Sequence, residues 1–173
     1  MKKIWIWAAM LILTLAGADR ALGAAADKQA QDAIVLFLKA DPGLKKFLES
    51  SVGYAVFPDV TKGGIGAAHG GGCVYEKGKL AGTASLTQVT IGLALGGQSY
   101  AELVFFETQE AFDSFKKSEL AFSAQVSAVA AAEGASSNAK YRLGVAVFTL
   151  ARGGLMYEAS LGGQKFKFKP LAK

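Results

Sequence analysis

Residues 26–41 carry a helical pattern of apolar positions, and a second such pattern follows at once. In the first segment the apolar residues recur at the spacing of a single helix face: Ala30, Ala33, Ile34, Phe37 and Leu38. Asp41-Pro42-Gly43 then ends this helix and begins the next, LKKFLESS (44–51), because Asp caps helix N-termini and Pro is tolerated in a first turn. The pattern predicts two consecutive amphipathic helices.

Two interpretations of this helical arm (residues 26–51) stay open. Its apolar stripes can pack on the rest of the domain. Alternatively, the arm lies on a membrane with its apolar face down and its lysines towards lipid phosphates. The same stripes would serve either arrangement.

From Gly53 onward the pattern is that of short strands with one helical interruption. YAVF (54–57) is an apolar run closed by Pro58-Asp59, and Lys77-Gly78 is a two-residue turn signal that leads into KLAGTASLTQVT (79–90). A strand over 91–106 follows, with a kink at its paired glycines. Thr108 is then the expected cap of a helix, QEAFDSFKK, whose acids come early and whose lysines come late.

The C-terminal part of the chain continues this β pattern. LAFSAQVSA (120–128) alternates apolar and small polar residues, which predicts a half-buried strand. AAAEGASSNA (130–139) is typical of a long mobile loop. Residues 141–163 and QKFKFKP (164–170) are expected to supply the last strands, with Gly162-Gly163 as a candidate hairpin turn.

Glycines are concentrated in KGGIGAAHGGGC (62–73), and the pattern GGxxYE occurs at both 71–76 and 153–158. Glycine inside a strand marks a bulge, a bend or a close backbone approach, and curled sheets need such points. We interpret both segments as bent strands. The sequence therefore predicts an α+β fold: a small antiparallel β-barrel or strongly coiled sheet with about three helices packed on its outside.

Residues 1–26 have the layout of a secretory signal peptide: two lysines, an apolar run over 4–16, and small residues at the end. The run is shorter than the ~20 residues that span a bilayer. Cleavage is expected after Gly23 or after Ala26, with an uncleaved anchor as the alternative. We therefore expect a periplasmic or secreted protein with one domain over 27–173.

Charge and cysteine content narrow the function classes. The whole chain carries 19 basic and 14 acidic residues, and removal of the signal leaves a net charge of +3. This mildly basic balance permits an anionic partner but falls short of a nucleic-acid-binding stripe, so no nucleic acid is expected. Cys73 is the only cysteine, which excludes an internal disulfide. It is either a buried thiol or a rare intermolecular bridge.

The catalytic motifs that the glycines suggest are incomplete. Gly64-Ile65-Gly66 runs into His69 instead of the last glycine of a dinucleotide fingerprint, and no Walker loop is present. His69 and Cys73 would stand ~13 Å apart on a strand, too far for a shared metal or a local dyad. Gly97-Gln98-Ser99-Tyr100-Ala101 resembles a nucleophile elbow, but its last glycine is replaced and the only histidine lies upstream. We expect no enzyme, no cofactor and no metal.

Several blocks of the sequence resemble the SYLF domain family. They are GYAVFPDVTKGGIGAAHGGGCVYEKGKLAGTASL, then IGLALGGQSYAELVFF with the helix TQEAFDSF, and YRLGVAVFTLARGGLMYEASLGG. The resemblance covers about residues 30–168. The chain departs from the family at AAEGASSNAK, where many members carry a Gly-Pro-x-Gly-Arg turn, and it lacks their Trp-Ser-x-Pro element.

The resemblance implies a β-barrel core with three surface helices and a lipid-binding module rather than a catalyst. Eukaryotic members are associated with phosphoinositides, through an amphipathic helix and basic residues, and some with actin. We do not expect actin as a partner of an exported protein. The partner expected from the resemblance is an anionic phospholipid membrane surface, bound weakly and reversibly.

Lysines are the candidate lipid-binding residues, since each one near an anionic surface contributes ~1 kcal/mol. They lie on the helical arm, at the head of the glycine-rich strand and in QKFKFKP: Lys39, Lys45, Lys46, Lys62, Lys165, Lys167 and Lys169. In QKFKFKP the lysines face one way and the phenylalanines the other. An edge strand that lysines protect from aggregation would look the same.

A second function stays open beside lipid binding. The chain would then be a cell-envelope interaction module without lipid preference, which binds a protein or peptide through its sheet edge or through residues 130–139.

Overall fold

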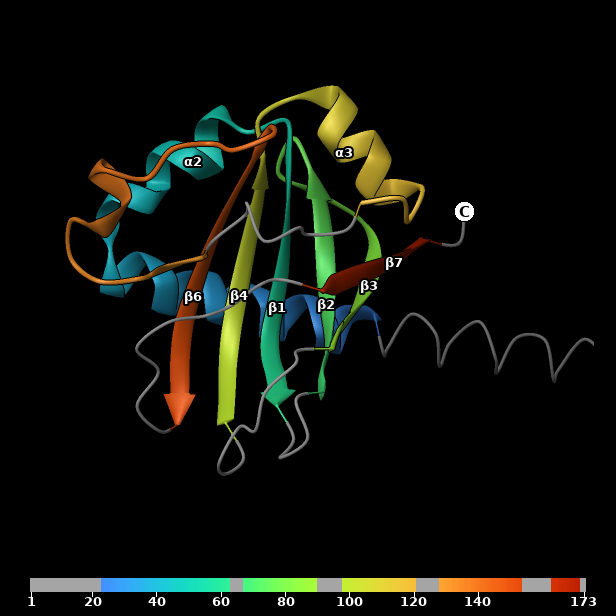
Figure 1. Ribbon diagram of the computed structural model, residues 1–173, viewed down its shortest axis with the longest axis horizontal. Coiled ribbons are helices and arrows are strands. Elements are labelled where there is room, and N and C mark those ends of the chain that lie inside the picture. Colours follow the sequence, from blue (N-terminus) through green and yellow to red (C-terminus); the bar gives the residue numbers. More distant parts are fainter. Residues whose placement is uncertain (1–22, 63–66, 90–97, 121–127, 154–162, 172–173) are drawn as a thin grey trace, which may run out of the picture.

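The computed structural model describes residues 23–62, 67–89, 98–120, 128–153 and 163–171 (Figure 1). These residues form one mixed sheet with the strand order β5-β6-β4-β1-β2-β3-β7. Neighbouring strands are antiparallel except for the short parallel pair β5 and β6. The strands are β1 Gly53–Lys62, β2 Ala67–Glu76, β3 Lys79–Val89, β4 Gln98–Phe106, β5 Ala128–Ala130, β6 Val145–Gly153 and β7 Gln164–Pro170.

Three α-helices accompany the sheet in the described part of the chain. The N-terminal helix covers residues 23–40. It is followed by the 3₁₀ turn η1 (Pro42–Leu44) and by α2 (Lys45–Ser50), while α3 (Gln109–Lys116) comes after β4. The two predicted N-terminal helices and the predicted helix after Thr108 are thereby confirmed. Among the described helices, none has the length and apolar character needed to cross a membrane.

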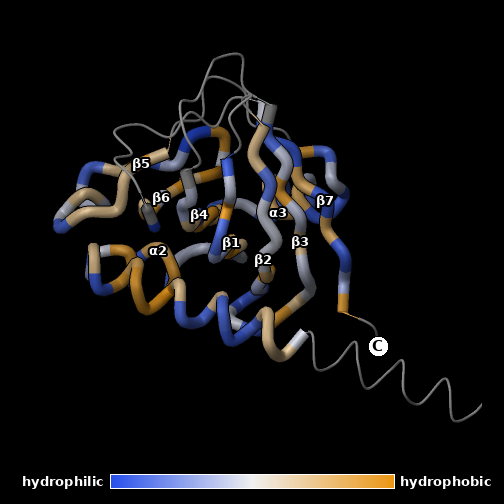
Figure 2. Tube along the Cα trace, turned by 90° about the horizontal axis from the view of Figure 1, so that it is seen from below, coloured by the Kyte–Doolittle hydropathy of each residue, from blue (hydrophilic) through white to orange (hydrophobic). Residues whose placement is uncertain are grey.

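The helices cover both faces of the sheet (Figure 2). On the outer face, the N-terminal helix and α2 pack on one core cluster, whose largest members are Phe37, Leu44, Tyr54, Tyr75, Leu103, Phe105 and Phe148. On the inner face, α3 packs on a second cluster, which includes Phe57, Phe106, Phe112, Phe115 and Phe166. Because both faces of the central strands are buried, YAVF (54–57) and LVFF (103–106) are continuous apolar runs.

The sheet is strongly coiled but not closed, so the barrel alternative predicted from the sequence is wrong. β7 pairs with β3 at one edge, while β5 forms the other edge. The coil nevertheless brings β7 back over the inner face of β1, where the rings of Phe166 and Phe57 lie 5.7 Å apart. β2 and β3 lie between these strands in the sheet, which shows how far it curls.

Local signals in the sequence had mixed outcomes. Lys77 and Gly78 form the predicted turn, with φ of 50° and 76°, and the Thr108 hydroxyl caps α3 by accepting from the backbone N–H of Ala111. Pro58 does not end β1, because the register shifts between Val56 and Asp59 accommodate a residue without an N–H.

The glycine-rich segment is also not a single strand. Lys62 ends β1 and Ala67 begins β2, so the hairpin connection falls inside KGGIGAAHGGGC. Several predicted features lie outside the described residues. They are residues 1–22 of the signal segment, the kink at 96–97, most of the predicted strand 120–128, residues 154–158 of the second GGxxYE and the Gly162 position of the predicted turn. Residues 23–26, predicted as the end of the signal segment, belong to the N-terminal helix.

The segment predicted as a mobile loop has defined structure. It contains the 3₁₀ turn η2 (Ala135–Ser137). Ser136 is buried, and its backbone N–H donates to Asp41 Oδ2 at 2.6 Å. Residues 130–139 are thereby joined to the end of the N-terminal helix.

Candidate functional site

The outer face of the sheet is uncovered where the N-terminal helix leaves it. On β2 the outer side chains of Cys73 and Tyr75 are buried beneath this helix, whereas His69 and Gly71, one step further along the strand, are exposed. On the neighbouring β3, Thr83 and Ser85 are half-buried and Thr87 is exposed, and the three lysines of β7 are exposed. We name this uncovered region the lysine face. It consists of the outer residues of β3 from Thr83 to Thr87, together with the outer residues of β2 and β7 that lie beside them.

On the lysine face each lysine of β7 stands opposite a hydroxyl of β3. The antiparallel register pairs Thr87 with Lys165, Ser85 with Lys167, and Thr83 with Lys169. Directly opposed residues in a sheet have Cβ atoms ~5 Å apart, so an ammonium group and a hydroxyl can reach one ligand atom together. The alternation also buries Gln164 and Phe166 and exposes the three lysines, as predicted for QKFKFKP.

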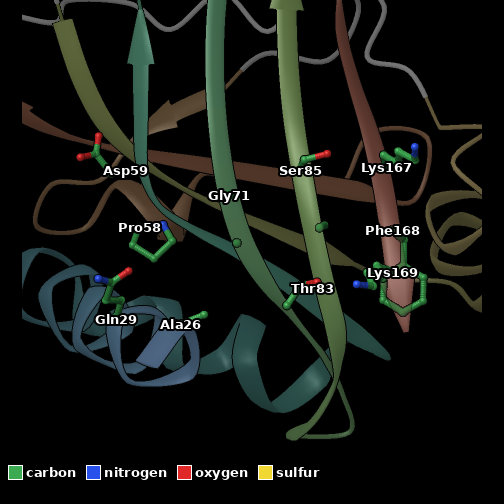
Figure 3. Close-up of a pocket in the computed structure, with 12 residues that line it drawn as sticks. Ala26, Gln29, Pro58, Asp59, Gly71, Thr83, Ser85, Lys167, Phe168 and Lys169 are labelled. Carbon is green, nitrogen blue, oxygen red and sulfur yellow. The ribbon is translucent and has the colours of Figure 1, made fainter. Parts of the chain in front are cut away.

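A hollow of about 690 Å³ lies on this face (Figure 3). Lys167, Lys169 and the hydroxyl residues Thr83 and Ser85 line one side, and Gln29 of the N-terminal helix lines the other. Gly71 forms part of the floor, and a Cβ added there would meet nothing within 4 Å. The hollow therefore exists partly because this position lacks a side chain.

The lysines of this face are available for an external anion. Among the described residues, no ion pair involves Lys165, Lys167 or Lys169. Asp59 of β1 is the acid that lines the hollow, and β2 and β3 lie between β1 and β7 in the sheet. The face is therefore cationic along β7.

The other four candidate lysines lie elsewhere. Lys39, Lys45 and Lys46 are exposed on the helical arm, and Lys45 pairs with Glu49 at 3.7 Å. The α2 part of this arm docks near the opposite edge of the sheet from β7, where Phe47 contacts Phe105 of β4 and Phe148 of β6. Lys62 is half-buried at the end of β1. The structure thus brings together three of the seven candidates.

The apolar stripe of the helical arm does not face a membrane. Ala30, Ala33 and Phe37 are fully buried against the outer face, so the packing interpretation is confirmed and the interpretation of a membrane-lying stripe is wrong. The apolar side chains that this helix does expose are different ones: Val35 is 63% and Leu36 is 42% exposed.

His69 and Cys73 form no common site. Cys73 is buried, and burial, together with the charge of Asp27, raises the pKa of its thiol to about 11. His69 is exposed on the same strand. Within the described ranges, no group of three metal-ligating side chains is found.

Sequence reasoning missed the contribution of β3 to the lysine face. The signal was present in the alternation of Thr83, Ser85 and Thr87, which places three hydroxyls on one side of a strand. These hydroxyls lie beside the lysines only because β3 pairs with β7, and the two strands are about 80 residues apart in the chain.

Two comparisons with known proteins bear on this arrangement. Residues 87–170 match the family described as Ysc84, Las17-binding protein actin regulator. Beta cell expansion factor A of Aeromonas veronii is 27% identical over 144 residues, which cover 82% of this chain and 55% of that protein. The chain thus spans about half the length of this curated relative. The two matches confirm the resemblance to the SYLF domain family found in the sequence, and the family match itself covers residues 87–170.

Proposed function

We propose that this protein is a non-catalytic module that binds anionic phospholipid headgroups at a membrane surface through the lysine face. The observation that carries the proposal is the register of β3 and β7, which places a hydroxyl opposite each of Lys165, Lys167 and Lys169. A phosphate offers several acceptor oxygens, which suit ammonium and hydroxyl donors side by side.

The strength of such binding is set by electrostatics. Each lysine near an anionic surface contributes ~1 kcal/mol, and salt screens this attraction. Three lysines thus support weak, reversible attachment. Leu171, which follows β7 and is 44% exposed, supplies an apolar side chain for shallow insertion next to Lys169.

Vesicle flotation tests the proposal. The protein is mixed with neutral vesicles and with vesicles that contain a fraction of phosphatidylglycerol, at low and at high salt. Binding is expected to grow with the anionic fraction and to fall as salt is added. The variant Lys165→Gln/Lys167→Gln/Lys169→Gln should bind on the order of 100-fold more weakly at low salt, because it loses ~3 kcal/mol.

A matched control carries the same change in charge on the helical arm. The variant Lys39→Gln/Lys45→Gln/Lys46→Gln should retain most of the binding. Loss of binding in this control with retention in the β7 variant would place the site on the helical arm. No binding of the unmodified protein to anionic vesicles at low salt would overturn the proposal.

Export belongs to the same proposal. The layout of residues 1–26 supports it, since a positively charged start, a short apolar run and small residues precede Asp27. N-terminal sequencing of protein recovered from the periplasm or the medium is expected to begin at Ala24 or Asp27. A full-length N-terminus in the cytoplasmic fraction would contradict export.

The matched family favours a second candidate, which is binding of a protein partner, because its description names the binding of another protein. A hollow of about 370 Å³ beside β6, lined by Asn138, Lys140 and Arg142, is a surface where an acidic peptide could bind. Flotation separates the two functions. A protein-interaction module would show no dependence on anionic lipid.

A further inference from the structure

A cluster of polar side chains is buried inside the coiled sheet, on its inner face. Gln88 comes from β3, Tyr100 and Glu102 from β4, and Gln164 from β7. Their exposed fractions lie between 0% and 3%. Because a buried polar group costs free energy unless it is hydrogen-bonded, the hydrogen bonds of this cluster indicate its protonation state.

The donors of the Gln164 amide are fully used. Gln164 Nε2 donates to Gln88 Oε1 at 3.3 Å and to Glu102 Oε2 at 2.9 Å. The Tyr100 hydroxyl also donates to Gln88 Oε1, at 3.3 Å. Two buried oxygens of the cluster have no hydrogen-bond partner, and they are Glu102 Oε1 and Gln164 Oε1. Both oxygens belong to residues that the 2.9 Å hydrogen bond from Gln164 to Glu102 already joins.

A carboxylic acid and a primary amide can pair through two hydrogen bonds that close a ring. The amide N–H donates to one acid oxygen, and the acid O–H donates to the amide oxygen. In this structure the first bond is present, and the second would join the two unpartnered oxygens. We propose that Glu102 is held as the neutral acid, with its Oε1–H donating to Gln164 Oε1, so that the pair forms a proton-dependent latch between β4 and β7.

The latch joins strands that the sheet does not pair. β1, β2 and β3 lie between β4 and β7 in the strand order. Backbone hydrogen bonds therefore cannot hold β7 across the inner face. Aromatic contacts between Phe166 and the rings of Phe57 and Phe115 also lie on this face. Loss of the proton would break one bond of the ring and leave a buried charge beside the Gln164 carbonyl oxygen.

An ionised Glu102 fits the surroundings poorly. Rotating the Gln164 amide by half a turn would place its oxygen against Glu102 Oε2 and would remove the donor to Gln88, so it does not satisfy both oxygens. On β4 the titratable neighbour is Tyr100, and its pKa is itself raised, by burial and by the charge of Glu102. Burial raises the pKa of Glu102 to about 8, although the hydrogen bond from Gln164 opposes this shift.

The charged groups on the surrounding elements do not offset this burial. On β1, Lys62 ends the strand on the inner face, by alternation from Val60. Glu76 of β2 and Lys116 of α3 pair with each other at 3.5 Å. His69 lies at the other end of β2. The inner residues that face Glu102 from β3, β6 and β7 are Gln88, Thr149 and Gln164, none of which carries a charge.

Carbon-13 NMR of glutamate side chains in the folded, unmodified protein tests the latch directly. The Glu102 carboxyl is assigned by its absence from the Glu102→Gln variant and titrated from about pH 5 to about pH 10. We expect its signal to remain that of the acid at pH 7 and to change above that. A signal that has already changed to the carboxylate by about pH 5 would overturn the proposal.

The pH dependence of unfolding provides a second readout. Above the unfolded pKa of ~4.5 the unfolded chain has released the proton that the native state keeps, so raising the pH favours unfolding. Between about pH 5 and pH 8, the unfolding equilibrium constant should therefore rise about tenfold per pH unit relative to Glu102→Gln. That variant can form an amide–amide ring with the same two bonds and should fold.

Tyr100→Phe is the matched control, because it removes a hydroxyl of the cluster that takes no part in the ring. It should keep the NMR titration of Glu102 and the pH dependence. An equal pH dependence of unfolding in Glu102→Gln and in the unmodified protein would overturn the latch. If Glu102→Gln does not fold, the titration of the glutamate signals in the unmodified protein still tests the latch. The latch requires a glutamate signal that remains that of the acid at pH 7.

Discussion

The backbone N–H of Ser136 donates to Asp41 Oδ2 at 2.6 Å, while Asp41 Oδ1 accepts from the backbone N–H of Gly43 at 3.0 Å. One carboxylate thus caps η1 and holds η2, 95 residues further along the chain. Gly43 is needed at this contact, because a Cβ there would lie against the Ser136 hydroxyl. The carboxylate therefore couples the helical arm to the segment between β5 and β6.

Asp41→Ala should lower the free energy of unfolding by about 3 kcal/mol, because it leaves two backbone N–H groups without their acceptor. Asp41→Asn keeps one acceptor and should cost less. Chemical denaturation measures both. Asp59→Ala, which changes an exposed acid, is the control and should have little effect.

Asp41 should also make the protein sensitive to acid. Burial alone would raise its pKa, but the hydrogen bonds from Ser136, Gly43 and Gly134 outweigh this and lower it. The native state therefore binds this proton more weakly than the unfolded chain, and stability is lost as the pH falls below about 4. Asp41→Asn should show a weaker loss in the same pH range, and an identical acid transition would contradict this account.

Tyr75→Phe should loosen the N-terminal helix. The Tyr75 hydroxyl donates to Asp27 Oδ1 at 2.6 Å and joins β2 to the first turns of this helix. Loss of a hydrogen bond to a charged group costs about 2 kcal/mol. We expect lower stability and faster proteolysis within residues 23–40. Unchanged cleavage there would show that the apolar stripe alone holds the helix.

Gly71→Ile should fill the hollow of the lysine face without unfolding the protein. Space above Gly71 is open, and a β-branched residue suits a strand. Binding to anionic vesicles should weaken, while the melting temperature should stay within a few degrees. At the neighbouring Gly72 an added Cβ would clash with the Val56 carbonyl oxygen, so Gly72→Ala should instead destabilise. Full binding by Gly71→Ile would show that the hollow itself holds no headgroup.

Cys73 should react with a thiol reagent only after unfolding. It is 1% exposed, and its pKa is raised to about 11, so little thiolate is present at neutral pH. Labelling should be slow in buffer and rapid in denaturant, with one thiol per chain as the internal standard. Rapid labelling of the native protein would show that the N-terminal helix leaves β2 readily.

Elements whose signals are local were predictable. Apolar residues at helical spacing, the Asp41 and Thr108 caps and the Lys77-Gly78 turn identified the helices and the hairpin between β2 and β3. Each of these features depends on contacts within a few residues. The outward direction of Lys165, Lys167 and Lys169 was predictable for the same reason, because alternation along one strand decides it.

Features that depend on distant pairing were not predictable. The sequence predicted either a barrel or a strongly coiled sheet. The coil is open because, among the described strands, the edge strand β7 pairs with β3 alone.

By itself, the sequence determined the three helices of the described residues, a sheet bent at its glycines and the lysine-bearing surfaces, since local periodicity and capping decide these. Only the tertiary structure decided which surface is free. The apolar stripe of the N-terminal helix could have faced lipid or protein, and burial of Phe37 and Ala33 resolved this. The coil likewise placed Thr83 and Ser85 beside the lysines and Gln164 against Glu102. These contacts join residues 60 or more positions apart, and no pattern within one element encodes them.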